Sequence, residues 1–377
     1  MKIAILTLPL HTNYGGILQA YALHTTLNGF GHEVKVLQKQ RYNTYPLSTR
    51  VKHGIHQLIN GILKLEMPEY VDVQHLVNKK KNEFKICSQY TQPFIDTYIS
   101  YQTIQSLYDI KEGEFDAIVV GSDQIWRQLY FTEMWEAPIS DAFLKFTRGW
   151  DIKRVAYAPS FGLDNISEYP SDVIHDCTEM LKSFDAVSVR EYSGVNICSS
   201  FFDTKAMVVV DPTMLLSKEN YISLINDSQK CNGNLLVYVL DCNERTDWLV
   251  YDIANKYHMQ PFYVNSKIDN QSASLNDRIQ PPVEQWLKGF RDADFVITDS
   301  FHACVFSIIF NKPFVVMGNK ERGMARFESL LMMFNQQHRL ITSTHNIDEA
   351  IITQNPNVDL TMFRHNALTF LKSALDT

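Results

Sequence analysis

Residues 294–317 read DFVITDSFHACVFSIIFNKPFVVM, and this stretch decides the fold. The apolar run at 295–297 predicts a buried strand, and the polar turn at 299–300 predicts the N-cap of a helix. That helix is expected at 302–310, and an Asn-Lys-Pro sequence ends it before a second strand at 314–316. The stretch is therefore a β-α-β unit. In an open parallel sheet, the turn after a strand opens onto the ligand crevice, and the helix N-terminus offers N–H groups to an anion.

The turn of this unit carries the residues that point to chemistry. Ser300 occupies the cap position, and His302 falls in the first turn of the predicted helix. An imidazole changes charge near neutral pH, so His302 is a candidate acid, base or anion-binding group. The alternative is structural: Ser300 only caps the helix, and His302 only fills a gap in the packing.

The composition is that of a globular protein with more than one domain. At 377 residues the chain is longer than a single core usually covers, so two domains are expected. Hydrophobic residues make up 45% and charged residues 20% of the chain, as in ordinary globular proteins. The formal net charge of −7 argues against a nucleic-acid partner, because nucleic-acid binding relies on neutralising phosphates. Any anion site must therefore be local.

The cysteines and the hydropathy indicate a reducing, aqueous compartment. None of the six cysteines forms a C-x-x-C pair, and several lie in apolar elements, where a reduced thiol packs as a small hydrophobe. We therefore expect a cytoplasmic protein. No run approaches the ~20 apolar residues of a membrane span, so contact with a membrane would be peripheral. The lysines at 79–81 are either a solvated face or a patch for anionic lipid.

A second β-α-β unit opens the chain. Strands are predicted at 2–8 and 34–37, with an apolar helix between them. The turn before that helix contains Asn13, Gly15 and Gly16, and glycine lets a backbone approach a ligand closely. This turn matches neither a G-x-G-x-x-G fingerprint nor a Walker loop. A tight turn that needs positive φ is the structural alternative.

Five predicted strands share one arrangement, an apolar run that ends in polar or charged residues. They span 2–8, 115–120, 154–158, 186–189 and 207–210. The carboxyl ends of parallel strands lie along one edge of a sheet, so the polar residues that follow them should converge. Those residues are Asn13, Ser122, Asp123, Ser160, Arg190 and Asp211.

The pattern restarts after residue 212, where a second and smaller α/β domain is predicted. Its first strand is expected at 235–240, and the unit at 294–317 forms its centre. Residues 41–112 are expected to be mostly helical and irregular, and an amphipathic helix is expected at 362–375.

Three basic residues follow the strand that ends the 294–317 unit. They are Lys320, Arg322 and Arg326. They are either ordinary surface charges or part of a site for an anionic ligand between the two domains.

Short motifs along most of the chain resemble those of the polysaccharide pyruvyl transferase family. They are NYGG at 13–16, FDAIVVGSDQIW at 115–126, AYAPSFG at 156–162, VSVRE at 187–191, VVDPT at 209–213 and ITDSFHA at 297–303. Each motif is short, but their order and spacing together are specific. The resemblance implies two Rossmann-like halves, 1–215 and 216–377, which face each other across a cleft as in GT-B glycosyltransferases. It also implies that the final helix crosses back to the first half.

The resemblance further implies a reaction. Members of this family transfer a carboxyethylidene group from phosphoenolpyruvate to two hydroxyls of a sugar, leaving a pyruvate ketal and free phosphate. The sugar would belong to a capsule or exopolysaccharide, or to a lipid-linked precursor. The first half, with Arg190, would hold this acceptor, and the second half, with His302, would hold the donor. Phosphoenolpyruvate is then a co-substrate, and no cofactor is expected.

The candidate residues suit this chemistry. Phosphoenolpyruvate carries a carboxylate and a phosphate, and arginine binds either group through two parallel hydrogen bonds. Arg190 is the first candidate for that contact, and the resemblance matches Arg190 and His302 to donor-site positions. His302 would be the acid or base, and Asp123 or Asp211 would hold it, orient the sugar or accept a hydroxyl proton. The remaining candidates, for substrate binding, are Asn13, Gly15, Gly16, Ser122, Ser160, Ser300, Arg322 and Arg326.

Two further questions concern the contacts to the donor and the need for a metal. Some family members carry an arginine where this chain has Ser300, so a donor contact is missing or comes from Arg322 or Arg326. No cluster of His, Cys or carboxylate residues has convincing metal-ligand spacing, so activity without a metal is expected. Residues 292–294 match the letters of a D-x-D metal motif, but they straddle a predicted helix end and strand start.

Two rival functions remain open at this point. One is a glycosyltransferase of the same two-domain shape that uses a nucleotide-sugar donor. The other is a binding protein of polysaccharide assembly without catalytic activity. The presence of both Arg190 and His302 argues against the second.

Overall fold

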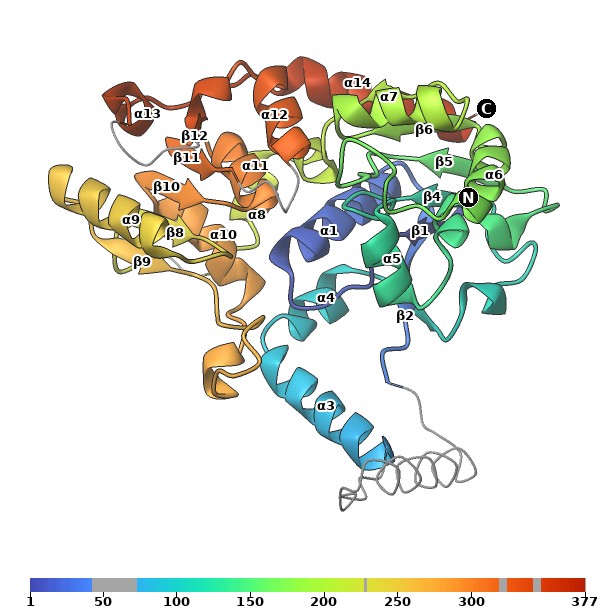
Figure 1. Cartoon of the computed structure of the whole chain (residues 1–377), viewed down its shortest axis with the longest axis horizontal. Helices are drawn as coiled ribbons and strands as arrows, with labels where there is room; N and C mark the ends of the chain where they lie inside the picture. Colours follow the sequence, from blue (N-terminus) through green and yellow to red (C-terminus); the bar gives the residue numbers. More distant parts are fainter. Residues whose placement is uncertain (43–72, 227–228, 319–323, 342–346, 377) are drawn as a thin grey trace.

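The computed structural model describes residues 1–42, 73–226, 229–318, 324–341 and 347–376, which form two parallel β-sheets covered by helices (Figure 1). The first sheet has seven strands in the order β3-β2-β1-β4-β5-β6-β7, and the second has five in the order β12-β11-β10-β8-β9. The strands of the first sheet are β1 (Lys2–Leu6), β2 (Glu33–Lys39), β3 (Tyr101–Ile104), β4 (Ala117–Val120), β5 (Lys153–Ala156), β6 (Ala186–Val189) and β7 (Met207–Val208). Those of the second sheet are β8 (Leu235–Tyr238), β9 (Pro261–Tyr263), β10 (Phe295–Thr298), β11 (Phe314–Met317) and β12 (Leu340–Ile341).

Helices join the strands and cover both sheets. Those that follow strands of the first sheet or connect to the second are α1 (Tyr14–Gly29), α3 (Val73–Cys87), α4 (Gln92–Tyr98), α5 (Gln128–Trp135), α6 (Ser171–Lys182), α7 (Tyr192–Phe201) and α8 (Lys218–Ile222). Those that follow β8 are α9 (Glu244–Lys256), α10 (Val283–Asp292), α11 (Phe301–Ile309), α12 (Met324–Met333), α13 (Glu349–Thr353) and α14 (Thr361–Asp376). The predicted α/β class with two parallel sheets is confirmed.

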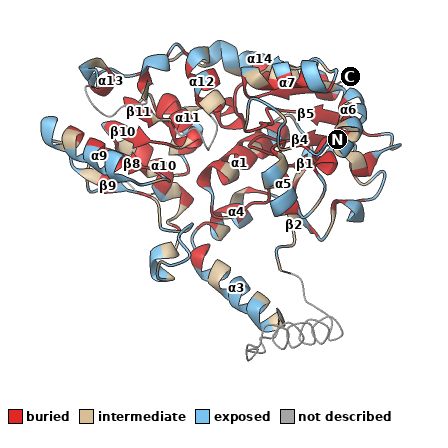
Figure 2. Ribbon diagram, viewed as in Figure 1, coloured by how far each residue is buried: buried red, intermediate tan, exposed pale blue. Residues whose placement is uncertain are grey.

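The central strands have no polar alternation, which explains why they occupy the middle of parallel sheets. β4 (AIVV), β8 (LLVY) and β10 (FVIT) are buried along their whole length. A strand covered by helices on both faces needs apolar residues on both faces, and it therefore appears as a continuous hydrophobic run. Figure 2 shows the same result, with β4, β8 and β10 buried and most of α3 and the outer side of α9 exposed or half-buried.

One apolar cluster extends through both halves of the protein. It contains Tyr14 and Leu18 of α1 together with Trp286 of α10 and Phe306 of α11. The short 3₁₀ turn η4 (Pro212–Leu215) packs against α1, α11 and α14, and so lies where the halves meet. The first sheet ends at Val208 and the second begins at Leu235. The division near residue 215 remains a prediction, but both halves clearly share packed core.

The C-terminal helix crosses back to the first half, as the resemblance implied. The ring of Phe370 on α14 lies 6.3 Å from the ring of Tyr157, which follows β5. Arg364 of the same helix donates from Nε to the Met214 carbonyl and from Nη2 to the Leu216 carbonyl, both at 3.0 Å. The same helix packs against β5 and η4 of the first half.

Some elements were not predicted from the sequence. β3 lies in the region expected to be helical and irregular, and it pairs with β2, so that Val36 is opposite Tyr101. The two-residue strand β12 at the edge of the second sheet was also missed. Of the region 41–112, residues 43–72 lie outside the described part of the chain. The lysines at 79–81 are all exposed on α3. Within the described ranges, no helix is long and apolar enough to cross a membrane.

Candidate functional site

The N-termini of two helices, one from each half, meet at the predicted site. Asn13 caps α1, and its Oδ1 accepts a hydrogen bond from the Gly16 N–H at 3.2 Å. Ser300 caps α11, and its Oγ accepts from the Ala303 N–H at 3.5 Å. The cap at Ser300 was expected from the sequence, whereas Asn13 was expected only as part of the turn before the helix. Since the N-terminus of a helix carries partial positive charge, the space beside these two ends favours an anion.

Gly15 allows the two helix ends to come into contact. A Cβ atom at this position would lie 2.1 Å from Nδ1 of His302, a distance that no real Cβ contact shows. The imidazole therefore rests on the bare backbone of α1. A Cβ at the neighbouring Gly16 would be 3.9 Å from Oδ2 of Asp123, which is ordinary contact. The first glycine of the turn is needed for packing across the halves, and positive φ plays no part in it.

Asp211 connects the polar groups of the two halves. Its Oδ2 accepts a hydrogen bond from Nη1 of Arg190 at 2.9 Å and from Oγ of Ser122 at 3.1 Å. The same oxygen is 3.6 Å from Nε2 of His302, an electrostatic contact too long for a direct hydrogen bond. Its Oδ1 accepts from the N–H and the hydroxyl of Thr213, at 3.0 and 2.7 Å.

These contacts keep Asp211 ionised although its side chain is fully buried. Burial by itself would raise the pKa of this carboxyl group, because it disfavours the charged form. The imidazole of His302 and the guanidinium of Arg190 lie beside the carboxylate, outweigh burial and hold the pKa of Asp211 well below its ordinary range. A carboxylate occupied in this way is better suited to fixing its neighbours than to exchanging protons.

Arg190 lies in the centre of the site and is surrounded by acidic groups. Its Nη2 is 3.8 Å from Oδ1 of Asp123, and its Nε is 3.8 Å from Oε2 of Glu191. Its Cζ lies 4.1 Å from the centre of the Phe301 ring, a cation–π contact. Burial lowers the pKa of Arg190, but the charges of Asp211, Glu191 and Asp123 raise it above its usual value.

Arg326 brings a second guanidinium group to the same place. Its Cζ lies 5.8 Å from the centre of the Phe301 ring, and its side chain is buried. Burial and the charge of Arg190 lower the pKa of Arg326 to about 10, against the opposing charges of Asp123 and Glu191. Two like charges in one buried region repel each other, so an anion bound between them would be stabilised by both.

Several buried donors in this cluster have no hydrogen-bond acceptor within the described ranges. They are Nε and Nη2 of Arg190 and Nε2 of His302. An unpaired buried donor costs ~1–3 kcal/mol, and more when it is charged. Native proteins rarely leave such groups unpaired, so each requires an explanation. An anionic ligand with several acceptor oxygens would pair all three.

The structure brings most of the predicted site residues together, but not all of them face a ligand. The hydroxyls of Ser122 and Ser160 are buried and donate to Asp211 and to Glu191, the latter at 2.6 Å. They support the charged residues from behind. Asp123 adopts a left-handed conformation with φ of 62° and approaches both Arg190 and Gly16. Arg322, also predicted, lies outside the described residues.

Three residues that contribute to the site were not predicted from the sequence. Glu191 anchors the loop after β5, because its Oε1 also accepts from the Phe161 N–H at 3.1 Å. Phe301 contacts both arginines, with its ring centre 4.1 Å from Cζ of Arg190 and 5.8 Å from Cζ of Arg326. Tyr14 packs into the second half. All three lie inside motifs that were recognised, next to residues that were selected, so proximity to Arg190, His302 and Gly15 was the available signal.

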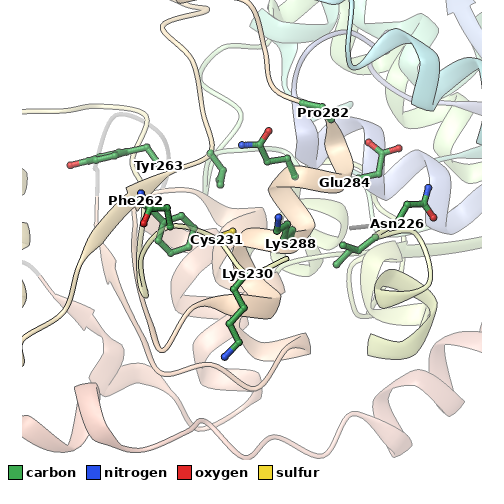
Figure 3. Close-up of a pocket in the computed structure, with 12 residues that line it drawn as sticks. Asn226, Lys230, Cys231, Phe262, Tyr263, Pro282, Glu284 and Lys288 are labelled. Carbon is green, nitrogen blue, oxygen red and sulfur yellow. The ribbon is translucent and has the colours of Figure 1, made fainter. Parts of the chain in front are cut away.

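A large cavity lies elsewhere in the second half and contains none of the predicted site residues (Figure 3). Its volume is about 730 Å³. It lies beside β9 and α10, and the residues around it include Lys230, Phe262, Tyr263, Pro282 and Glu284. No histidine or arginine lies among the described residues that line this cavity. The cluster around Arg190 is therefore the better candidate for the active site.

No metal site accompanies the cluster in the part of the chain that the structure describes. No group of three or more His, Cys, Asp or Glu side chains there could hold an ion. The D-x-D letters at 292–294 fall where α10 ends and before β10 begins, as expected. Asp292 binds the Cys231 N–H and pairs with Arg291, while Asp294 accepts from Asn234. These carboxylates are therefore structural.

Comparison with known proteins gives the fold and a family. A family model described as polysaccharide pyruvyl transferase matches residues 13–321. The chain is similar to UDP-GlcNAc 2-epimerase from Neisseria meningitidis bound to UDP-GlcNAc, with 12% identity, a TM-score of 0.51, and coverage of 100% of this chain and 99% of that one. It is also similar to S. aureus MnaA in a co-structure with UDP, with 13% identity, the same TM-score of 0.51, and coverage of 100% and 97%. At such identities the likeness concerns the GT-B-like fold alone. No curated protein matches the chain.

Proposed function

The chain belongs to the polysaccharide pyruvyl transferase family, and we propose that it transfers the carboxyethylidene group of phosphoenolpyruvate to two hydroxyls of one sugar. The products are a pyruvate ketal on the sugar and free phosphate. The acceptor is a polysaccharide unit or its precursor. If that precursor is lipid-linked, the protein works in the cytoplasm at the membrane surface.

One observation supports the donor most directly: at the junction of two helix N-termini, buried donors of Arg190 and His302 find no acceptor among the described residues. Phosphoenolpyruvate carries a carboxylate and a phosphate, whose oxygens could accept from Nε and Nη2 of Arg190 and from Nε2 of His302. Arg326 offers a second guanidinium within reach of the same region. In this chain it would supply the contact that some relatives make with an arginine at the position of Ser300. The site thus binds two acidic groups without a metal ion.

The proposed reaction requires one proton to enter and two to leave. His302 gives a proton to the methylene carbon of the donor, which becomes a methyl group, and the central carbon becomes oxocarbenium-like. One sugar hydroxyl attacks that carbon, the bond to the phosphate oxygen breaks, and the second hydroxyl closes the ketal. Of the two hydroxyl protons, one replaces the proton that His302 donated, and the other leaves with phosphate. Arg190 and the helix ends stabilise the departing charge.

The two carboxylates of the site take different roles in this proposal. Asp123 has a side chain that is 12% exposed and lies at the edge of the cluster, so it is placed to accept a proton from a sugar hydroxyl or to orient the sugar. Asp211 is fully buried and already accepts from three side chains, so it positions Arg190 and His302. The acceptor would approach from the first half, on the side of Asp123.

The test is ligand-dependent stabilisation followed by turnover. A ligand at ~100 times its dissociation constant stabilises a protein by ~2.7 kcal/mol, so phosphoenolpyruvate should raise the melting temperature measurably. UDP-GlcNAc and other nucleotide-sugars serve as the comparison. Phosphate should then be released from phosphoenolpyruvate when a sugar acceptor is added. A larger shift with a nucleotide-sugar, or no shift with phosphoenolpyruvate at any concentration, would contradict the proposal and favour a glycosyltransferase.

A further inference from the structure

Tyr14 belongs to the first half but is packed inside the second. It is the first residue of α1, and its side chain is completely buried. Its ring stacks on the Trp286 ring of α10, with centroids 5.5 Å apart and planes 26° apart, and lies 6.3 Å from the Tyr238 ring at the end of β8. Its hydroxyl donates to the Pro281 carbonyl at 2.7 Å.

A second contact from the same turn reinforces this insertion. Nε2 of Gln280, just before Pro281, donates to the Thr12 carbonyl at 3.1 Å. The side chain of Tyr14 and the backbone of Thr12 therefore bond to two consecutive residues, Gln280 and Pro281, in one loop of the second half. The turn that leads into α1 is anchored in the opposite half, away from its own sheet.

The residue after Tyr14 is the one that touches His302. Because Gly15 and Tyr14 are consecutive in one helical turn, the depth to which the Tyr14 ring is inserted fixes the distance between the Gly15 backbone and the imidazole. A helix turn is rigid on the scale of this contact, since its hydrogen bonds fix the backbone of adjacent residues together. The Ile17 N–H bonds to the Asn13 carbonyl at 3.0 Å and closes this turn.

We propose that Tyr14 is a positioning residue for the reaction, which presses the N-terminus of α1 against His302 and so assembles the anion site from the two halves. This proposal rests on the proposed function for its chemistry. Its structural part, the setting of one helix end against another, does not depend on the identity of the ligand. The stacked ring of Tyr14 sets how far the start of α1 reaches into the second half. The hydrogen bond from its hydroxyl to the Pro281 carbonyl sets the orientation of the ring.

Tyr21 provides a matched control on the same helix. Its ring packs against Phe94 and Tyr98, with centroids 5.6 and 6.0 Å away, and both belong to the α4 helix of the first half. It is 9% exposed, so its loss also removes a buried aromatic ring. Tyr21→Leu should therefore lower stability without moving α1 relative to the second half.

The first experiment compares hydrogen exchange of full-length wild type, Tyr14→Leu and Tyr21→Leu, without ligand. Two backbone bonds report on the site, from Ile17 N–H to the Asn13 carbonyl and from Cys304 N–H to the Ser300 carbonyl, both at 3.0 Å. We expect Tyr14→Leu to speed exchange at least tenfold in peptides covering both helix ends, and Tyr21→Leu to leave the α11 peptide unchanged. Equal effects of the two substitutions on that peptide would overturn the proposal.

The second experiment measures phosphate release from phosphoenolpyruvate. Tyr14→Leu should lower kcat on the order of 10- to 100-fold. Without the ring, the Gly15 backbone no longer fixes the position of the His302 imidazole, which is the group proposed to protonate the donor. Tyr14→Phe keeps the ring and should recover most of that loss, and it keeps the test valid if the leucine variant does not fold. A kcat unchanged in Tyr14→Leu would overturn the positioning role. Absence of turnover in wild type would refute the proposed function instead, while the exchange experiment would still decide the role of Tyr14.

Discussion

Gly15→Ala would add a single methyl group at the contact between α1 and His302. The new Cβ would lie 2.1 Å from Nδ1, 2.4 Å from Cγ and 2.8 Å from Cε1 of the imidazole. Ordinary contact begins at 3.4 Å, so the ring or the helix end must move by more than ~1 Å. A displacement of about 1 Å in a reacting group costs on the order of 10²-fold in rate. We therefore expect kcat to fall about 100-fold while the protein remains folded, because the clash lies between the halves and outside both sheets.

Phosphate release from phosphoenolpyruvate with a panel of sugar acceptors would measure this effect, alongside the melting temperature. Gly29→Ala is the matched control, since a Cβ at the other end of α1 meets no atom of the described residues within 4 Å. Gly16→Ala separates two causes, because its Cβ comes no closer than 3.9 Å to Asn13 and Asp123. If Gly15→Ala is as active as Gly29→Ala, the contact with His302 has no role in catalysis. If Gly16→Ala loses as much as Gly15→Ala, the loss reflects blocked approach of the ligand to the backbone.

Four other predictions concern the residues of the charged cluster and the need for a metal. His302→Gln should keep the fold and some donor affinity but lose turnover by a factor on the order of 10² to 10⁴, and a variant that keeps its turnover and loses only stability would contradict the acid role. Arg190→Lys should chiefly weaken phosphoenolpyruvate binding, seen as a raised concentration for half-maximal thermal stabilisation, because an ammonium group cannot replace a planar guanidinium. Asp211→Asn should destabilise the protein by ~3–5 kcal/mol at neutral pH, since it leaves buried cations without their partner. Because the pKa of Asp211 is lowered in the folded state, this stabilisation is fully present above the ordinary carboxyl pKa of about 3.9. It is lost progressively as the pH falls from there toward the lower pKa of the folded state, so denaturant titrations of wild type and variant should draw together in acid. Turnover should survive EDTA, and activity that is lost in the chelator and restored by magnesium would show that a metal is required.

The part of the fold that could be predicted from sequence is the part controlled by hydrophobic pattern. The strands at 115–120 and 295–297 are short apolar runs bounded by polar turns, and the structure contains β4 and β10 there. β3 could not be recognised in the same way, because its sequence YQTI carries polar residues and an exposed tyrosine. It forms a strand because β2 provides unpaired backbone groups at the edge of the sheet. This pairing joins segments that are far apart in the sequence, so the residues of β3 alone do not reveal it.

The site was predictable to the extent that it depends on strand ends. Ser122, Arg190 and Asp211 were expected to converge, and they do so through hydrogen bonds of 2.9 and 3.1 Å to one carboxylate. What could not be predicted is how the second half meets the first. Packing between the halves determines the insertion of Tyr14 and the position of Arg326 near the Phe301 ring. The hydrophobic pattern of either segment does not predict this packing.

The arrangement around Asp211 makes the site a property of the joined halves. Its carboxylate accepts from Ser122 and Arg190, which follow strands of the first sheet, and faces His302, which follows a strand of the second. A buried carboxylate that lost either partner would bear the cost of an uncompensated charge, several kcal/mol. Stable packing of the halves and a correctly charged site therefore require each other. The proposed reaction must add a proton at one end of a small donor that carries a carboxylate and a phosphate, and it must release charge at the other end. It benefits from this arrangement, because every group involved is held before the donor arrives.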